Sequence, residues 1–396
     1  MTTDAGQQLL ADLSEADLNP ANTLKWVERL RVDYPTPYIH ALLTTVQLRE
    51  AAQVKFGADA ARMYFTEAAL QQASDPLVRA YRRKPVRPDE RVLDLCCGVG
   101  SDALAFAKTG VPVLGVDIDP IRIRMAQLNA AVLNVSDARF VVADVTRRDT
   151  IEDYAASTVF FDPGRRTDTG RRIFDVSQYL PPLDTIQLYA DVPRRLVKIS
   201  PGVDLAQLSD LPARVEFVSI SGALKEALLH LGGVDDQPSL MATLLLDDQA
   251  QEDNLRVLHW HAQSLNELPA IQEPRRWLVE PDPALIRAGF VQHAALAFDG
   301  VLLDETIAYF TAGQRPESPW VRAWEVLDWM PFNMKRLRTY LRQRDVGQIT
   351  VKKRGSAVSP EALQHGLKLK GEASRTIVLT RLKGQQIAII CADYTA

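Results

Sequence analysis

Hydrophobic and polar positions follow a helical period at the beginning of the chain and a different pattern further on. Apolar residues recur every three or four positions through 41–56 and 60–73, which predicts amphipathic helices. Beyond Pro85 and Pro88, short apolar runs alternate with helical stretches. Such alternation is typical of a parallel sheet covered by helices. We therefore expect a helical N-terminal domain over residues 1–88, followed by an α/β domain.

The α/β pattern extends over residues 89–248 and contains seven apolar runs, each of a length typical of a strand. We expect strands at 92–97, 112–116, 138–142, 158–161, 195–200, 214–221 and 240–246. The fold class predicted for this part is therefore α/β, with a seven-stranded sheet.

The remainder of the chain is predicted to be a connecting segment, 249–323, and a small α+β domain, 324–396. The connecting segment predicts a strand, a proline stop and a short helix within 274–289 but is otherwise hard to interpret. Lys383-Gly384-Gln385 has the composition of a tight hairpin turn. In the last domain we expect a strand, a helix over 333–344, a strand over 347–353, a helix over 359–367, and strands over 375–382 and 386–392.

Composition excludes several classes of protein. The 396 residues are 46% hydrophobic and 24% charged, as in globular proteins, and no apolar run reaches the roughly 18 residues that span a bilayer. The first residues lack the pattern of a signal peptide, so we expect a cytoplasmic protein without a membrane segment. The three cysteines offer neither a disulfide framework nor a zinc spacing, and His259 and His261 have no third ligand at a suitable spacing, so no metal is expected.

Charge is distributed unevenly although the net charge is only −4. Residues 331–396 contain 13 Lys or Arg and four acids, so this segment is strongly basic and the rest of the chain is acidic. Such asymmetry indicates a polyanionic partner. The alternative is a basic surface that is merely solvated or pairs with acids of the same chain.

The first predicted strand is followed by a glycine turn and a helix. Gly98 and Gly100 allow a tight backbone turn that approaches a ligand closely. Asp117 follows the second strand, where a carboxylate can accept hydrogen bonds from both hydroxyls of a ribose. Asp144 follows the third strand, where an adenine amino group could donate to it. This pattern predicts a site for a nucleoside cofactor.

Two cofactors compete for this site. The spacing of the glycines and Asp117 also fits a nicotinamide dinucleotide, whose pyrophosphate needs free helix N–H groups and no nearby acid. Asp94 and Asp102 flank the turn, and such acids repel phosphate and suit a cation. S-adenosylmethionine (SAM) carries an ammonium and a sulfonium but no phosphate, so the acids favour SAM. An ordinary βαβ unit with incidental acids is the structural alternative.

The segment LDLCCGVGSDALAFA, together with Asp117 and Asp144, resembles the first motifs of class I SAM-dependent methyltransferases. It is similar to the bacterial group with a THUMP-like C-terminal domain, related to trimethylguanosine synthase, over most of the chain after about residue 55. The resemblance implies a Rossmann-like methyltransferase sheet and SAM as cofactor. The cofactor-binding residues that it implies are Asp94, Gly98, Gly100, Asp102, Asp117, Ile118 and Asp144, with Thr66 and Gln72 from a capping segment.

The resemblance also locates an acceptor site. The fourth strand ends in Asp162-Pro163-Gly164-Arg165-Arg166, where amine methyltransferases have Asp/Asn-Pro-Pro-aromatic. Asp162 and Pro163 are the expected catalytic pair, and Phe161, Phe174 or Tyr179 would replace the missing aromatic ring.

Substrate contacts are expected from cations at the same edge of the sheet. Arg165 and Arg166 begin an arginine-rich loop, and guanidinium groups bind phosphate in a bidentate manner. Lys198, at the end of the fifth strand, would contact the substrate or extend to solvent.

We therefore expect a SAM-dependent methyltransferase that acts on RNA or another nucleotide-containing substrate, with RNA bound by the basic C-terminal domain. Two alternatives remain open. One is a small-molecule methyltransferase, and the other is a SAM-binding RNA-binding module without catalysis.

Overall fold

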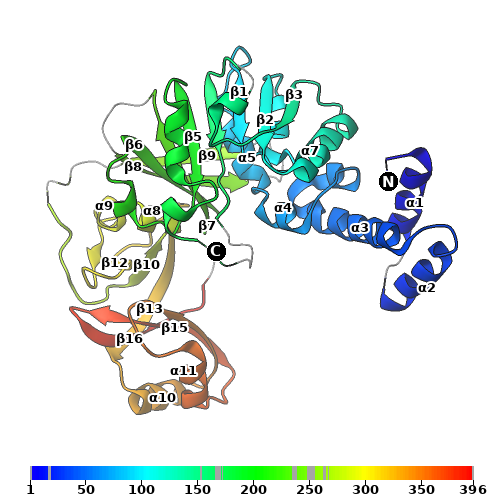
Figure 1. Cartoon of the computed structure of the whole chain (residues 1–396). Helices are drawn as coiled ribbons and strands as arrows, with labels where there is room; N and C mark the ends of the chain where they lie inside the picture. Colours follow the sequence, from blue (N-terminus) through cyan, green and yellow to red (C-terminus); the bar gives the residue numbers. More distant parts are fainter. Residues whose placement is uncertain are drawn as a thin grey trace. The chain divides into compact units, whose positions relative to one another are not determined.

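The structure is a computed structural model. It describes residues 2–16, 19–151, 154–165, 171, 173–233, 239–247, 255–261, 265 and 267–394. Two compact units are present (Figure 1), and each is described by itself. The first comprises Met1–Arg214, Ala227–Pro238 and Asp247–Leu255, and the second comprises Val215–Glu226, Ser239–Leu246 and Arg256–Ala396.

The first unit begins with helices, as the apolar period predicts. They are α1 (Asp4–Glu15), α2 (Pro20–Leu30), α3 (Thr36–Phe56), the 3-10 helix η1 (Gly57–Ala61), α4 (Glu67–Gln72) and α5 (Pro76–Arg83). Side chains of α1, α2 and α3 share one apolar core, which includes Leu13, Leu30 and Ile39. This core explains why apolar residues recur at three- and four-residue spacing.

Asn129 joins the helical segment to the sheet that follows. This fully buried side chain lies in α7 (Pro120–Val132). Its amide oxygen accepts from the Tyr64 backbone N–H at 2.7 Å, and its amide nitrogen donates to the carbonyls of Tyr64 and Val99, each at 3.0 Å. The segment preceding α4 is therefore fixed against the loop after the first strand.

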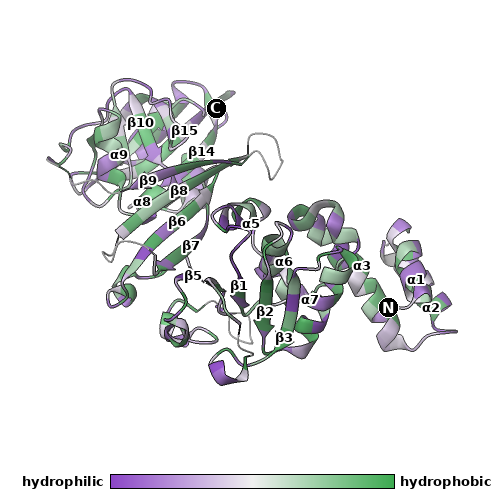
Figure 2. Ribbon diagram, turned by 90° about the horizontal axis from the view of Figure 1, so that it is seen from above, coloured by the Kyte–Doolittle hydropathy of each residue, from purple (hydrophilic) through white to green (hydrophobic). Residues whose placement is uncertain are grey.

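The main sheet has nine strands in the order β3-β2-β1-β4-β5-β7-β6-β8-β9. Strands β3 to β5 pair in parallel, and β7 is antiparallel to β5. Every residue of β1 and β2 is buried, and both strands are mainly hydrophobic apart from Asp94 and Asp117 (Figure 2). The strands are β1 (Val92–Leu95), β2 (Val113–Asp117), β3 (Ala138–Val142), β4 (Thr158–Phe161), β5 (Arg194–Ile199), β6 (Ala213–Ile220), β7 (Ala223–Leu231), β8 (Ser239–Asp247) and β9 (Leu255–His261).

The expectation of a seven-stranded sheet is wrong in its strand number, because β7 and β9 are additional strands. The sequence of β7, ALKEALLHL, consists mainly of good helix formers and lacks alternation. Four consecutive residues from Glu226 to Leu229 are buried, so both faces of this strand are covered. Burial on both faces removes the period of two by which a strand is normally recognised.

The remaining strands of the second unit form a seven-stranded sheet in the order β11-β12-β10-β13-β16-β15-β14. Its first elements are β10 (Trp277–Pro281), α8 (Pro283–Arg287), α9 (Val291–Ala297), β11 (Val301–Leu302), β12 (Phe310–Ala312) and β13 (Val321–Pro331). The strand, proline stop and short helix expected within 274–289 are β10 and α8.

The C-terminal elements agree closely with the predicted α+β pattern. They are α10 (Met334–Arg342), β14 (Val346–Lys353), α11 (Pro360–Leu367), β15 (Ala373–Leu382) and β16 (Gln385–Cys391). Leu382 pairs with Gln385, so the hairpin loop is Lys383-Gly384, and both residues have positive φ, 48° and 79°. A two-residue loop with two positive φ angles matches the twist of the strands that it connects.

Helices α10 and α11 cover one face of this small sheet. Leu337, Leu341, Leu363 and Leu367 pack with Ile377 and other strand residues in one apolar cluster. No helix among the described residues is long and apolar enough to cross a membrane.

Candidate active site

The carboxyl ends of β1, β2, β4 and β5 bring several charged residues to one edge of the parallel sheet. After β1 the chain turns through Cys96, Gly98 and Gly100, all of which have positive φ, 64°, 57° and 84°. An ideal Cβ at Gly98 would meet no atom within 4 Å, whereas one at Gly100 would lie 3.0 Å from the Phe140 ring. The glycines therefore serve the turn itself and, at Gly100, close packing against β3.

Asp94 is buried within β1, just before this turn. Its Oδ2 atom has no hydrogen-bond partner among the described residues, and it is only 1% exposed. Burial raises the pKa of the Asp94 carboxyl well above its ordinary value, and the negative charges of Asp102 and Asp162 act in the same direction. The positive charge of Arg82 opposes this shift. A buried acceptor without a partner is suited to a ligand that brings a cationic donor.

Asp117 connects the first two strand ends. Its Oδ2 accepts from the Gly98 backbone N–H at 2.9 Å, and its Oδ1 accepts from the Asp119 backbone N–H at 3.0 Å. The side chain is buried, but each carboxylate oxygen has further acceptor capacity. The next residue, Ile118, is a large apolar side chain that is 69% exposed, which leaves an apolar surface beside the carboxylate.

Asp144 lies beyond β3 and is half-buried. It accepts from the Thr146 backbone N–H and hydroxyl at 2.9 and 2.7 Å, and these hydrogen bonds lower the pKa of the Asp144 carboxyl. Its position at the third strand end agrees with the sequence-based prediction, although part of its acceptor capacity is used within its own loop.

Asp102 takes part in a buried ion pair. Its Oδ1 accepts from Arg82 at 2.6 Å, and Arg82 also lies 4.6 Å from the centre of the Phe160 ring. Ser74 donates to Asp102 Oδ2 at 3.4 Å. Arg82 and Ser74 belong to the helical segment, so that segment contributes to the site in a way that sequence patterns did not indicate.

Asp162 follows β4 and pairs with Lys198 of β5. The Lys198 ammonium donates to Asp162 Oδ2 at 2.6 Å and to the Ser74 hydroxyl at 3.0 Å. Lys198 is 4% exposed, so the expectation that it might extend to solvent is wrong. The Asp162 side chain is 22% exposed, and its Oδ1 has no hydrogen-bond partner among the described residues. One carboxylate oxygen is therefore fixed and the other is available.

The three candidate aromatic residues differ sharply in exposure. Phe161 and Tyr179 are fully buried, and the Tyr179 hydroxyl accepts from the Ser200 backbone N–H at 3.3 Å. Phe174 is 55% exposed and lies beside Gly202, where an ideal Cβ would be 3.7 Å from its ring. Phe174 is thus the only one of the three with a free ring face.

Other predicted residues have different surroundings. Thr66 is the N-cap of α4 and accepts from the Ala69 backbone N–H at 3.1 Å, while Gln72 is exposed. Pro163 is buried and Arg165 is half-buried. Arg166 lies outside the described residues.

Cys96 is half-buried at this edge, whereas Cys97 is buried. Burial raises the pKa of its thiol well above the ordinary value, and the charges of Asp117, Asp162 and Asp94 raise it further. The thiol is therefore held in its protonated form, which is a poor nucleophile. Among the described residues, no group of three or more His, Cys, Asp or Glu is arranged to hold a metal ion.

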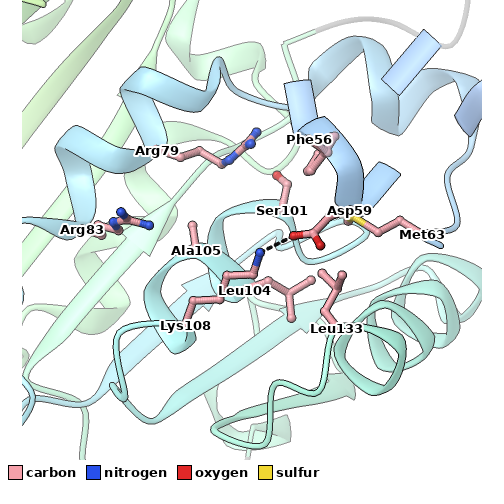
Figure 3. Close-up of a pocket in the computed structure, with 10 residues that line it drawn as sticks. All are labelled: Phe56, Asp59, Met63, Arg79, Arg83, Ser101, Leu104, Ala105, Lys108 and Leu133. Atoms are coloured by element: carbon pink, nitrogen blue, oxygen red, sulfur yellow. Dashed lines mark hydrogen bonds and ion pairs between the residues drawn. The ribbon is translucent and has the colours of Figure 1, made fainter. Parts of the chain in front are cut away.

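A separate pocket lies on the flank of α6 (Ser101–Ala107), between that helix and the helical segment (Figure 3). Lys108 and Asp59 form an ion pair across it at 2.5 Å, and Arg79 donates to the carbonyls of Ser74 and Lys55. None of the predicted cofactor-binding residues lines this pocket. Its cations already hold helices together, so we assign it no ligand.

Comparison with known families agrees with this geometry. Residues 89–203 match the family described as RNA cap guanine-N2 methyltransferase, and residues 321–393 match the family described as THUMP domain-like. Residues 1–52 match a domain of unknown function.

A curated relative matches almost the whole chain. It is an uncharacterised SAM-dependent methyltransferase of Mycobacterium tuberculosis, 30% identical over 89% of this chain and 95% of that protein. The fold and the strand-end site define a class of nucleoside-cofactor enzymes. More specifically, the chain belongs to the SAM-dependent methyltransferases, and its cofactor is SAM.

Two other similarities are more limited in what they show. The crystal structure of a methyltransferase of unproven activity from Porphyromonas gingivalis has a TM-score of 0.77 at 19% identity and covers 95% of this chain and 99% of that chain, which shows the fold. The 23S rRNA (uracil(1939)-C(5))-methyltransferase of Shewanella woodyi is 38% identical, but over only 20% of this chain and 18% of that enzyme.

The residues present fit SAM. Asp94 offers the unpartnered buried acceptor that an ammonium requires, and Asp117 and Ile118 offer an acceptor beside an exposed apolar surface, as a nucleoside requires. No arginine or lysine interrupts the turn from Gly98 to Gly100. The roles of the individual cofactor-binding residues are predictions that substitutions can test.

Asp117→Ala is expected to weaken SAM binding by about 1–3 kcal/mol, because the ribose loses a charged acceptor. Isothermal titration calorimetry measures this change. Asp119→Ala is the matched control, since Asp119 is a neighbouring carboxylate that caps α7 through the Ile121 backbone N–H at 2.8 Å. An unchanged dissociation constant in folded Asp117→Ala protein would remove Asp117 from the cofactor site.

Proposed function

We propose that this enzyme methylates an exocyclic amine of an RNA base. The observation that carries the proposal is the Asp162 carboxylate, which has one oxygen fixed by Lys198 and the other available at the cofactor edge of the sheet. An ionised carboxylate accepts hydrogen bonds only, so it suits an N–H donor. Bound SAM supplies the electrophilic methyl group.

Asp162 would orient the amine so that its nitrogen lone pair is directed at the methyl carbon. A proton leaves the nitrogen after transfer and can pass to water or to the carboxylate. Little more than positioning is required of the protein, because correct orientation alone removes a large part of the barrier. Gly164 and Arg165 stand in place of the usual proline and aromatic residue. Phe174, with its exposed ring beside Gly202, would provide an aromatic stacking surface there.

Carbon methylation is the second candidate, because the Shewanella enzyme is named for a uracil C5 product. The C5 atom of a pyrimidine becomes nucleophilic only after another nucleophile has added to the ring, and a thiolate is the usual group for such an addition. Cys97 is buried, and Cys96 is held protonated by burial and three carboxylates. These surroundings support nitrogen rather than carbon as the acceptor.

Two groups of basic C-terminal residues differ in their partners. Lys352 and Arg354 pair with Glu280 at 2.6 and 3.3 Å, and Lys352 also lies 4.3 Å from the centre of the Trp324 ring. Both cations therefore form ion pairs within the second unit. The run from Lys352 to Arg354, the densest cluster of cations in this part of the sequence, is a poor candidate for phosphate contact.

The second group forms what we term the α10–α11 surface, defined as Lys335, Arg338, Arg342, Lys368 and Lys370. Arg338 donates to the Gly366 carbonyl, and Arg342 donates to the Lys368 carbonyl at 2.7 Å, so the face of α10 lies beside the end of α11. None of the five has an ion-pair partner among the described residues. We infer that RNA phosphates contact this surface, because unpaired cations bind polyanions by releasing counterions.

Substitution of Lys335, Lys368 and Lys370 by Ser tests this surface without removing the arginines that cap α11. We expect weaker binding of total RNA and a salt slope reduced by roughly 0.7 to 0.9 for each lost contact. Filter binding over a salt series measures both. The control replaces Lys25, Arg29 and Arg31, which are exposed cations in and after α2, and so changes net charge equally. Equal behaviour of the two triple variants would contradict the proposed surface.

The function itself is tested by labelling RNA from a strain that lacks the gene with tritiated SAM and the purified protein. We expect label in RNA, and digestion should yield a nucleoside methylated on an exocyclic nitrogen. Label in small molecules alone would favour the small-molecule alternative. Binding of SAM with no transfer to any pool would favour a module without catalysis.

A further inference from the structure

Lys198 is a buried ammonium whose partners lie on two different segments. Its side chain extends from β5 and is 5% exposed, and a buried lysine is rare unless it is paired. One partner is the Asp162 carboxylate at 2.6 Å, and the other is the Ser74 hydroxyl at 3.0 Å. Together these contacts fix the ammonium within the site rather than at its surface.

Ser74 links this pair to a second one. It donates to Asp102 Oδ2 at 3.4 Å, and Asp102 Oδ1 accepts from Arg82 at 2.6 Å. Cations and carboxylates therefore alternate from Arg82 through Asp102 and Ser74 to Lys198 and Asp162. Paired charges within hydrogen-bond distance compensate for the cost of removing each of them from water.

We propose that Lys198 is a positioning residue that orients Asp162 toward the acceptor amine, and that Ser74 fixes Lys198. This inference rests on the proposed function, because it assigns Asp162 to the acceptor. It also differs from a substrate contact by Lys198, since the ammonium is already engaged by two protein oxygens.

One physical consequence follows for Asp162. Its Oδ2 is held at a fixed position, so its free Oδ1 has a defined direction. Small errors in such a direction are costly in the transfer step. Without Lys198, Asp162 would rotate more freely.

Lys198→Met and Lys198→Arg test this role, because methionine has a similar volume without charge whereas arginine keeps the charge. For Lys198→Met we expect kcat for RNA methylation to fall by about 100-fold, with SAM affinity changed by less than about threefold. Lys198→Arg should recover part of the rate, because a cationic donor to Asp162 is retained.

Lys108→Met is the matched control, since it breaks another Lys–Asp pair in the same unit, with Asp59, away from the strand ends. It should leave both kcat and SAM affinity unchanged. An unchanged kcat in Lys198→Met, or a collapse of SAM binding, would overturn the positioning role.

A double-mutant cycle with Lys198→Met and Asp162→Asn supplies a readout that needs no substrate. Thermal unfolding should show that the double variant is more stable than the two single effects predict, because each single change leaves the other group unpaired. Additive effects would overturn the ion pair. Absence of RNA methylation by the wild-type protein would instead contradict the proposed function and leave this cycle as the test of Lys198.

Discussion

Asp162→Ala is expected to reduce methyl transfer by about 10²- to 10³-fold, as removal of one preorganised group at a reaction centre typically does. SAM affinity should change little, because the carboxylate is assigned to the acceptor. It lies after β4, whereas Asp117, the acid assigned to the ribose, lies at the end of β2. Single-turnover labelling measures the chemical step, and calorimetry measures cofactor binding. Asp162→Asn should retain more activity than Asp162→Ala, since the amide oxygen can still accept from an amine.

A different result would reassign this residue. If SAM affinity collapses while the residual turnover is normal, Asp162 belongs to the cofactor pocket. Loss of folding is distinguished by comparing the unfolding temperature with that of Lys198→Met, which breaks the same ion pair from the other side.

Asp94→Asn is expected to weaken SAM binding by about 1.5–3 kcal/mol, because a charge-assisted hydrogen bond to the ammonium is lost. SAM affinity of the wild-type protein should also increase with pH, since the raised pKa of Asp94 leaves it protonated without ligand and the ammonium favours the ionised form. This pH dependence should be flattened in Asp94→Asn. Calorimetry in buffers of different ionisation enthalpy would detect the released proton.

Asp94→Asn should also change how the free energy of unfolding depends on pH. A carboxyl whose pKa is raised in the folded state contributes stability below its ordinary unfolded value, and that contribution is lost as the pH rises through the folded-state value. Asparagine has no charge to lose, so unfolding of Asp94→Asn should depend less on pH above the ordinary carboxyl range. A protein that loses SAM binding while its pH dependence of unfolding is unchanged would show that Asp94 is not the group responsible.

The strand-end acids were predictable because parallel strands bring their carboxyl ends to one edge, whatever the helices between them contain. In the structure Asp94 lies within β1 and Asp117 is the last residue of β2, whereas Asp144 and Asp162 come after β3 and β4. The C-terminal hairpin was predictable for a similarly local reason, since Lys383-Gly384 forms the positive-φ loop by itself.

The partners of these acids were not predictable from local patterns. Lys198 has a position typical of a lysine that extends to solvent, but in the structure it is buried and donates to Ser74 of the helical segment. Glu280 similarly takes up Lys352 and Arg354 from more than 70 positions away in sequence. Charge counts along a chain cannot distinguish cations that have such partners from those that remain exposed.

The Arg82–Asp102 pair has a consequence for modularity. The match to the methyltransferase family begins at residue 89, which suggests a catalytic core that might be separated from the helices before it. A protein beginning there would lack Arg82 and Ser74, both of which donate to the Asp102 carboxylate. An exchange of helical segments at this boundary would separate Asp102 from its cation, so we expect Arg82 and Asp102 to be inherited together.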